Sequence, residues 1–393
     1  MQMRDAGSYA VVIRNELGPV TSTAAAVAVG SAPIISTPTI IAPTISAQPS
    51  AQSVLGGQSL TLAITVTGAP APTLQWRKDG EPIAGATGTT FSVPSAQAGD
   101  AGAYTVVVTN TAGTVTSTAA TVAVNTSRIV NLSIRSALTP GAALLTVGFV
   151  VSGSGKNLLA RGVGPTLAQF GLTNALADPR IALFAGSSAL ANNDNWSTAA
   201  NAAQVSSTAA QIGAFALGAG SNDAAVLTSF DDGTYSAQIS GPANASGIVL
   251  VELYDANPAS ASRLVNVSTR AQVGRGENIL VAGFVVSGNA PKTLLIRAIG
   301  PTLAAFGVTD VLADPRLEII GSTATGTVAA NDNWGGSTAL SSAFAARGAF
   351  PLAAADSKDA ALLVTLQPGN YSAQVSGVGD TTGEALIEIY EVP

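Results

Sequence analysis

Residues 156–184 read KNLLARGVGPTLAQFGLTNALADPRIALF, and residues 292–320 read KTLLIRAIGPTLAAFGVTDVLADPRLEII, so the chain carries the same pattern twice. In both copies Leu, Ile, Val and Ala form short runs, which Gly-Pro and Asp-Pro pairs separate. Such runs have the length of buried β-strands, and Gly and Pro are typical of the turns between strands. The stretch therefore predicts a β-sheet domain that occurs twice.

The duplication extends to both sides of this stretch. Upstream, residues 128–153 overlay residues 263–288, and each copy ends with the pattern G-x-x-L-x-E-x-Y. Many short strands in succession favour a two-layer sandwich or a jelly roll. We expect one such unit at residues 126–257 and a second, separate one at residues 258–393.

One segment in each copy departs from the strand pattern. Residues 197–215 and 337–350 place Ala, Val, Ile or Phe at roughly helical spacing after a Ser-Thr start. A Ser or Thr before an apolar periodic run is a typical helix start. We expect a short helix or a pair of turns in each copy.

Composition excludes several classes of function. Charged residues make up 10% of the chain, the net charge is −6, and there is no Cys and no His. Without Cys and His the chain lacks thiol nucleophiles, His-based triads, thiolate metal sites and disulfides. A carboxylate pair of the glycosidase kind needs no His, but the carboxylates are sparse and repeat in both copies, which suits structure better than one cleft, so we expect no enzyme. A basic patch for nucleic acid is also missing. The longest apolar runs, at residues 278–286 and 247–254, are too short to span a bilayer.

A second, shorter repeat lies in the first third of the chain. Residues 1–29 overlay residues 96–124 without a gap, with the shared pattern D-A-G-x-Y-x-V-V-x-x-N. Alternating Val and Thr, followed by a turn sequence, predict a β-hairpin in each copy.

Residues 56–85 show the patterns G-x-S-L-T-L and W-x-K-D-G, and D-A-G-x-Y follows. Together these motifs resemble an immunoglobulin-like domain of the intermediate type, which we assign to residues 47–125. The resemblance implies that Trp76 packs in the core. It also implies that the Tyr104 hydroxyl fixes the turn between two strands by a hydrogen bond to the backbone. Ile64 and Val106 stand where the family has its disulfide, so apolar packing would replace that bond.

By the same resemblance, residues 1–29 look like the last two strands of another immunoglobulin-like domain. An isolated hairpin is marginally stable in water, so either the chain is a fragment of a longer protein or a partner supplies the missing strands. We expect the former, with an export signal upstream of Met1. Prolines in residues 30–46 predict an extended linker.

The two long copies resemble C-terminal repeats of large exported proteins from Verrucomicrobia-like bacteria. Their latter parts, with the motifs A-N-D-N-W and G-x-Y-x-A-x-V-S-G in the second copy and close variants of both in the first, are also similar to bacterial pre-peptidase C-terminal domains. Both resemblances imply a secreted, appended module.

Charged residues recur at matching positions of the two copies. Arg161 and Arg297 lie in apolar strands, and we expect them to bond carboxylates or loop carbonyls within their own sandwich. A second set supplies the hard oxygen ligands that calcium prefers, so we consider a calcium site in each copy. Asn/Asp turns that bond their own backbone are the alternative. The candidate ligands are Asp178, Asn193, Asp194, Asp223, Asp314, Asn331, Asp332 and Asp359.

The sequence thus predicts an all-β protein of tandem β-sandwiches, with an immunoglobulin-like unit before two jelly-roll-like units that each contain a short helix. We expect a non-catalytic extracellular or cell-surface protein, structural or adhesive, that presents its surfaces to a protein or glycan partner. The alternative is a carbohydrate-binding accessory region of a larger secreted hydrolase. No cofactor is expected other than calcium.

Overall fold

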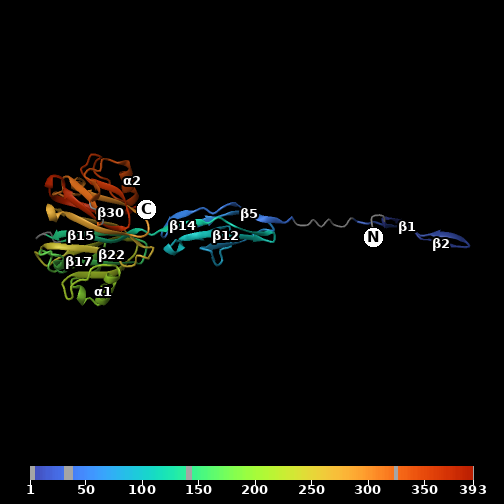
Figure 1. Ribbon diagram of the computed structural model, residues 1–393, viewed down its shortest axis with the longest axis horizontal. Coiled ribbons are helices and arrows are strands. Elements are labelled where there is room, and N and C mark those ends of the chain that lie inside the picture. Colours follow the sequence, from blue (N-terminus) through green and yellow to red (C-terminus); the bar gives the residue numbers. More distant parts are fainter. Residues whose placement is uncertain (1–4, 31–38, 139–143, 323–325, 393) are drawn as a thin grey trace.

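The computed structural model describes residues 5–30, 39–138, 144–322 and 326–392. Strands dominate it, and the all-β class is confirmed. Figure 1 shows three parts in series: a thin N-terminal part, a narrow sandwich and a wide C-terminal body.

The N-terminal part consists of short antiparallel pairs. Strands β2 (Val12–Asn15) and β3 (Gly18–Thr21) form the expected hairpin, and β1 (Gly7–Tyr9) pairs with β4 (Ala25–Val27). Most of its apolar side chains are exposed; Leu17, for example, is 97% exposed. That these strands belong to a second immunoglobulin-like domain stays a prediction.

The narrow sandwich has an immunoglobulin-like core. Trp76 is fully buried, and its ring centroid lies 6.1 Å from that of Phe91. The Tyr104 hydroxyl donates to the carbonyl of Asp100 at 2.8 Å, as the resemblance implied. The strands are β5 (Ile41–Ala47), β6 (Gln52–Leu55), β7 (Leu60–Ala63), β8 (Thr65–Ala69), β9 (Thr73–Lys78), β10 (Glu81–Pro82), β11 (Thr90–Val93), β12 (Gly102–Asn110), β13 (Gly113–Thr116) and β14 (Ala120–Asn125).

The wide body contains two sheets, each of eight strands within the described residues. The first runs in the order β20 (Ala224–Phe230), β17 (Lys156–Val163), β22 (Gly247–Asp255), β15 (Arg128–Leu138), β24 (Leu280–Ser287), β29 (Gly369–Gly377), β26 (Pro315–Gly321) and β27 (Thr327–Asn331). The second runs in the order β19 (Ser188–Asn193), β18 (Arg180–Ala185), β21 (Gly233–Ser240), β16 (Leu145–Ser152), β23 (Arg263–Val273), β30 (Gly383–Val392), β25 (Lys292–Ile299) and β28 (Ala360–Leu366).

The two repeats share both sheets. Strand β15 of the first repeat pairs with β24 of the second, and β16 pairs with β23. Because β23 and β24 are the second copies of β15 and β16, the two junctions repeat the same pairing. The repeats are therefore related by an internal two-fold pseudosymmetry.

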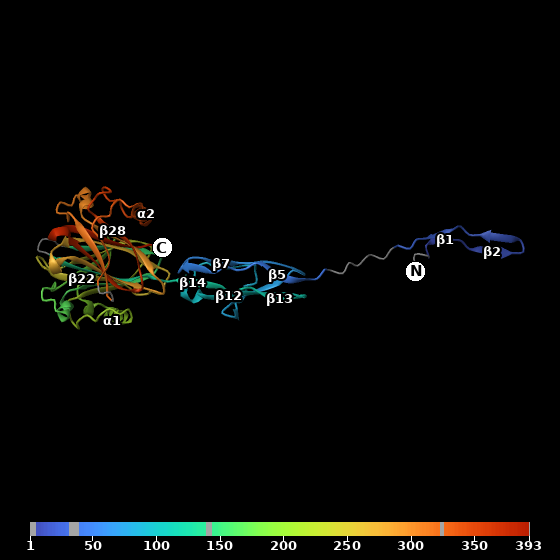
Figure 2. The same ribbon diagram turned by 45° about the horizontal axis from the view of Figure 1, so that its top comes forward.

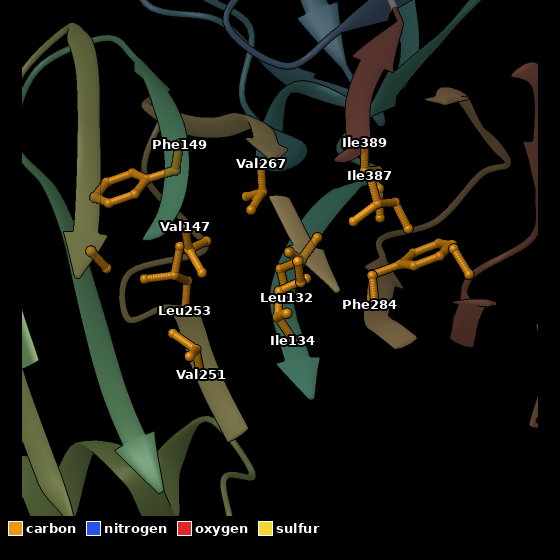
Figure 3. Close-up of a cluster of buried hydrophobic side chains, with 14 of the residues drawn as sticks. Leu132, Ile134, Val147, Phe149, Val251, Leu253, Val267, Phe284, Ile387 and Ile389 are labelled. Carbon is orange, nitrogen blue, oxygen red and sulfur yellow. The ribbon is translucent and has the colours of Figure 1, made fainter. Parts of the chain in front are cut away.

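One hydrophobic core runs through both repeats. Figure 3 shows Leu132 of β15 and Phe149 of β16 in the same buried cluster as Phe284 of β24 and Ile387 of β30. All four side chains are no more than 2% exposed. Our expectation of separate sandwiches was wrong in this respect, because the strands that would be edges of an isolated unit pair across the repeats.

Each repeat adds a helical cap to the outside of the sandwich. Helix α1 (Ala202–Gln211) and helix α2 (Thr338–Arg347) fall inside the two segments predicted to be helical. They lie on opposite outer sides of the wide body (Figure 2). Val205 and Ala209 of α1 and Leu340 and Phe344 of α2 are buried, and they contribute to separate small cores beneath the two caps.

The shared sheets predict the behaviour of one repeat made alone. Residues 126–262 would expose the pairing edges of β15 and β16, which are complementary because each junction joins a β15-type strand to a β16-type strand. We expect this fragment to form a two-fold dimer by light scattering, whereas residues 126–393 stay monomeric. A well-folded monomer of residues 126–262 would contradict the shared-sheet arrangement.

Candidate functional site

The structure places Asp223, one of the predicted calcium ligands, in a fully buried position just before β20. Its carboxylate accepts hydrogen bonds from the backbone N–H groups of Gly164 (2.7 Å) and Thr166 (3.3 Å). The hydroxyls of Thr166 and Ser221 also donate to it. The carboxylate thus satisfies the unpaired amides at the start of the short helix Pro165–Phe170.

The second repeat has the same arrangement around Asp359. The carboxylate accepts from the N–H groups of Gly300 (2.8 Å) and Thr302 (3.3 Å) and from the hydroxyls of Thr302 and Ser357. A Cβ atom on Gly300 would lie 2.0 Å from the backbone oxygen of Leu312, so only glycine fits at this close approach. The Gly-Pro-Thr motif therefore forms a binding site for a carboxylate of the chain itself, which we call the Gly-Pro-Thr seat.

The Asn residues of the predicted site hold turns together. The Asn193 side chain accepts from the N–H of Ala225 at 3.0 Å and donates to the carbonyl of Asn195 at 3.2 Å. Asn331 does the same in the second copy, at 2.9 Å to both Ala361 and Asn333. These contacts agree with the alternative in which the cluster bonds its own backbone.

The remaining predicted ligands lie near the surface. Asp194 and Asp332 are exposed. Asp178 lies 3.9 Å from the guanidinium of Arg180, and Asp314 lies 3.7 Å from the amine of Lys358. Within the described residues, no three carboxylates come together as a metal-binding group. Calcium binding at the eight residues stays a prediction.

Trp196 and Trp334 anchor the Asn/Asp turns to the helical caps. The backbone N–H of Trp196 donates to the carbonyl of Asp223 at 2.8 Å, and that of Trp334 donates to Asp359 at 2.9 Å. The Trp334 ring lies 5.7 Å from the Phe344 ring of α2. Each tryptophan thus connects the backbone of the buried aspartate to the cap.

A buried Arg–Glu pair lies beneath each cap. In the first repeat the Arg161 Nε donates to a carboxylate oxygen of Glu252 at 2.8 Å, and Arg161 also donates to the carbonyl of Phe215 at 2.6 Å. The Phe215 ring covers the guanidinium at 4.3 Å. Arg297 makes the same contacts with Glu388 and Phe350 in the second repeat. The expected bonding of both arginines to carboxylates and carbonyls is confirmed.

Two tyrosines complete these pairs. The hydroxyl of Tyr254 donates to the free carboxylate oxygen of Glu252 at 2.8 Å, and Tyr390 donates to Glu388 at 2.9 Å. Burial raises the pKa of both tyrosines, and the adjacent glutamate charge raises it further. The tyrosines therefore stay neutral donors at neutral pH.

Sequence reasoning missed the carboxylates that pair with the two buried lysines. Lys156 contacts Asp255 at 2.6 Å, whereas Lys292 and Arg263 each lie 3.6 Å from Glu391. Asp255 and Glu391 occupy matching positions after the G-x-x-L-x-E-x-Y pattern, but their different residue types hid the match. A comparison of the copies by charge rather than by identity would have found them.

The immunoglobulin-like unit is joined to the wide body by specific contacts. The Asn289 side chain accepts from the N–H of Thr126 at 3.2 Å and donates to the carbonyl of Val124 at 2.9 Å. Arg263 donates to the carbonyl of Ser127 at 2.9 Å. The short connection between β14 and β15 is thereby held against the second repeat.

The buried Arg–Glu pairs predict the cost of breaking one partner. We expect Glu252→Gln to lower the free energy of unfolding by about 3–5 kcal/mol, because it leaves the Arg161 charge buried without its counter-ion. The exposed pair of Asp178 and Arg180 provides a control, and Arg180→Gln should cost about 1 kcal/mol or less. Urea denaturation monitored by circular dichroism compares them, and equal costs would refute a structural role for the buried pair.

Comparison with known proteins identifies one part of the chain. Residues 43–124 match the immunoglobulin I-set domain family. A 59-residue stretch is 51% identical to the decoration protein of Escherichia phage T5. This match covers 15% of this chain and 36% of the phage protein. Human hemicentin-1 is 42% identical over 74 residues, or 16% of this chain and 1% of hemicentin-1. The titin M3 domain structure is 31% identical, covering 21% of this chain and 97% of that one, with a TM-score of 0.20.

The chain therefore spans only a minor part of the curated relatives that it matches. The matched residues are those in which Trp76 fills the core and Tyr104 bonds back to Asp100. Residues 43–124 of this chain form an immunoglobulin-like domain.

Proposed function

We propose that this chain is a non-catalytic extracellular or cell-surface protein that acts as a structural or adhesive element. The immunoglobulin-like domain and the similarity of one segment to hemicentin-1 support this proposal. The resemblance of the long repeats to exported bacterial modules supports a secreted bacterial origin. Within the described residues, no helix combines the length and hydrophobicity needed to cross a bilayer.

One observation carries the proposal: buried ionisable groups of both repeats are tied into the same structural networks. Arg161 and Arg297 are bound by glutamate, and Asp223 and Asp359 are bound by backbone amides. Groups that are held identically in two copies, with their bonding capacity used within the fold, suit a scaffold better than a reaction centre. The function then belongs to the surfaces.

Outer strands of the shared sheets offer such a surface. Leu190 of β19, Val328 of β27 and Leu363 of β28 are exposed by 48%, 44% and 43%. Among the residues that the structure describes, these strands end their sheets, so they also carry unpaired backbone groups. A protein partner that adds an extended segment to such an edge is the binding mode that we favour.

A glycan partner is the second candidate, and exposed aromatic rings favour it. Phe170 and Phe306, at matching positions of the two repeats, are 57% and 63% exposed. Each packs edge-on against a second phenylalanine, which leaves part of its ring open to solvent. An exposed aromatic ring can stack on a sugar. This feature would suit the accessory region of a secreted hydrolase.

The location of the protein tests the proposal first. Antibodies against residues 43–392 should label intact cells of the source organism or detect the protein in the medium, because the proposed surfaces must face outward. An antibody to a cytoplasmic enzyme serves as the control for cell integrity. Labelling that requires permeabilised cells would contradict the proposal. A glycan array then separates the partners: binding that is lost in Phe170→Ala and Phe306→Ala together would favour the accessory-region alternative.

A further inference from the structure

A cavity of about 310 Å³ lies where the immunoglobulin-like domain meets the second repeat. The loop around Gly57 and the hydroxyl-bearing Ser95 form one wall. The opposite wall carries charged side chains from the paired repeats: Arg263 of β23, Lys292 of β25, Arg347 of α2 and Glu391 of β30.

The charges of this cavity do not balance. Three cations line it against one carboxylate, which leaves an excess of two positive charges. The carboxylate of Glu391 also has several neighbours. One of its oxygens accepts a hydrogen bond from the backbone N–H of Ile129 at 2.6 Å. The other oxygen lies 3.6 Å from both the Arg263 guanidinium and the Lys292 amine. These two separations exceed normal hydrogen-bond lengths, so Glu391 does not saturate either cation.

The positive excess is larger in the second repeat than in the first, where Arg128 and Lys156 lie near one carboxylate, that of Asp255. In the first repeat the amine of Lys156 forms a salt bridge with the carboxylate of Asp255 at 2.6 Å. Ile212 occupies the position that matches Arg347, so the first repeat has no charge there. Within the described residues, Arg347 has no hydrogen-bond or ion-pair partner, and its Nε atom is buried. Burial lowers the pKa of Lys292, and the charges of Arg263 and Arg347 act in the same direction against the opposing effect of Glu391.

We infer that this cavity binds a doubly charged tetrahedral oxyanion, a phosphate or a sulfate group. Guanidinium groups match the geometry of such oxyanions through paired N–H donors. Arg347 and Arg263 both have a buried Nε atom without a hydrogen-bond acceptor, and Lys292 adds a point charge. Two negative charges on the ligand neutralise the excess of the site.

The bound anion would also connect two domains. Gly57 and Ser95 belong to the immunoglobulin-like domain, whereas the three cations belong to the paired repeats. An oxyanion that bridges the two walls would stabilise their relative orientation, in addition to the Asn289 contacts. The site therefore predicts that anion binding stiffens the junction.

Isothermal titration calorimetry of the full chain tests the site, with sodium phosphate and sodium sulfate as probes in a chloride buffer of constant ionic strength. A sugar phosphate in a separate titration distinguishes a phosphate monoester, which also carries close to two negative charges, from the free ion. We expect saturable binding of at least one probe, weakened about tenfold or more in Arg347→Gln, since a charge-assisted hydrogen bond is lost. Arg14→Gln is the matched control, because Arg14 is exposed on β2, far from the cavity (Figure 1), and should bind as the unmodified chain does.

Thermal melts guard against a folding artefact. Without phosphate or sulfate, Arg347→Gln should melt at the same temperature as the unmodified chain or higher, because it removes repulsion among the three cations. Adding the bound probe should raise the melting temperature of the unmodified chain and of Arg14→Gln, but not that of Arg347→Gln. The inference is overturned if no probe binds more tightly than chloride, or if Arg347→Gln binds as well as the unmodified chain.

Discussion

The pairing of β15 with β24 and of β16 with β23 is the interaction on which the rest of this structure depends. Through it, two sequence repeats that could each have closed their own sandwich instead form two continuous sheets. The inner edges of the two repeats, where isolated β proteins tend to associate, are paired inside the chain, and the outer strands β19, β20, β27 and β28 end the sheets within the described residues. The result is a single wide body that carries a cap on each outer side.

The low charge content of the chain gives each buried ion a structural role. Arg161 and Arg297 hold the caps through glutamate and loop carbonyls, and Asp223 and Asp359 hold the Gly-Pro-Thr seats. Such groups cost free energy when they are desolvated, and only complete pairing offsets that cost. The networks around them therefore specify where the turns and caps lie. The cavity beside Arg347 departs from this pattern, because its cations outnumber their partners.

Local pattern predicted local structure well. The Trp76 and Tyr104 motifs indicated the immunoglobulin-like core, and the spacing of Ala and Phe located α2. The merging of the repeats was not predictable, because alternation along β15 shows which face is buried but not which strand pairs with its edge. Likewise, the carboxylate of Asp223 suggested a calcium ligand from its residue type alone. Only the fold shows that backbone amides of a loop distant in sequence donate hydrogen bonds to it.

Tryptophan fluorescence provides the most direct test of the shared core, since each unit contains one tryptophan: Trp76, Trp196 and Trp334. Single-tryptophan variants, with the other two changed to Phe, report the urea-induced unfolding of each unit. Because each variant lacks two tryptophans, its own midpoint is the reference. The shared sheets predict that Leu132→Ala, in the first repeat, shifts the transitions reported by Trp196 and by Trp334 by the same amount. A shift of the Trp196 transition alone would contradict the account.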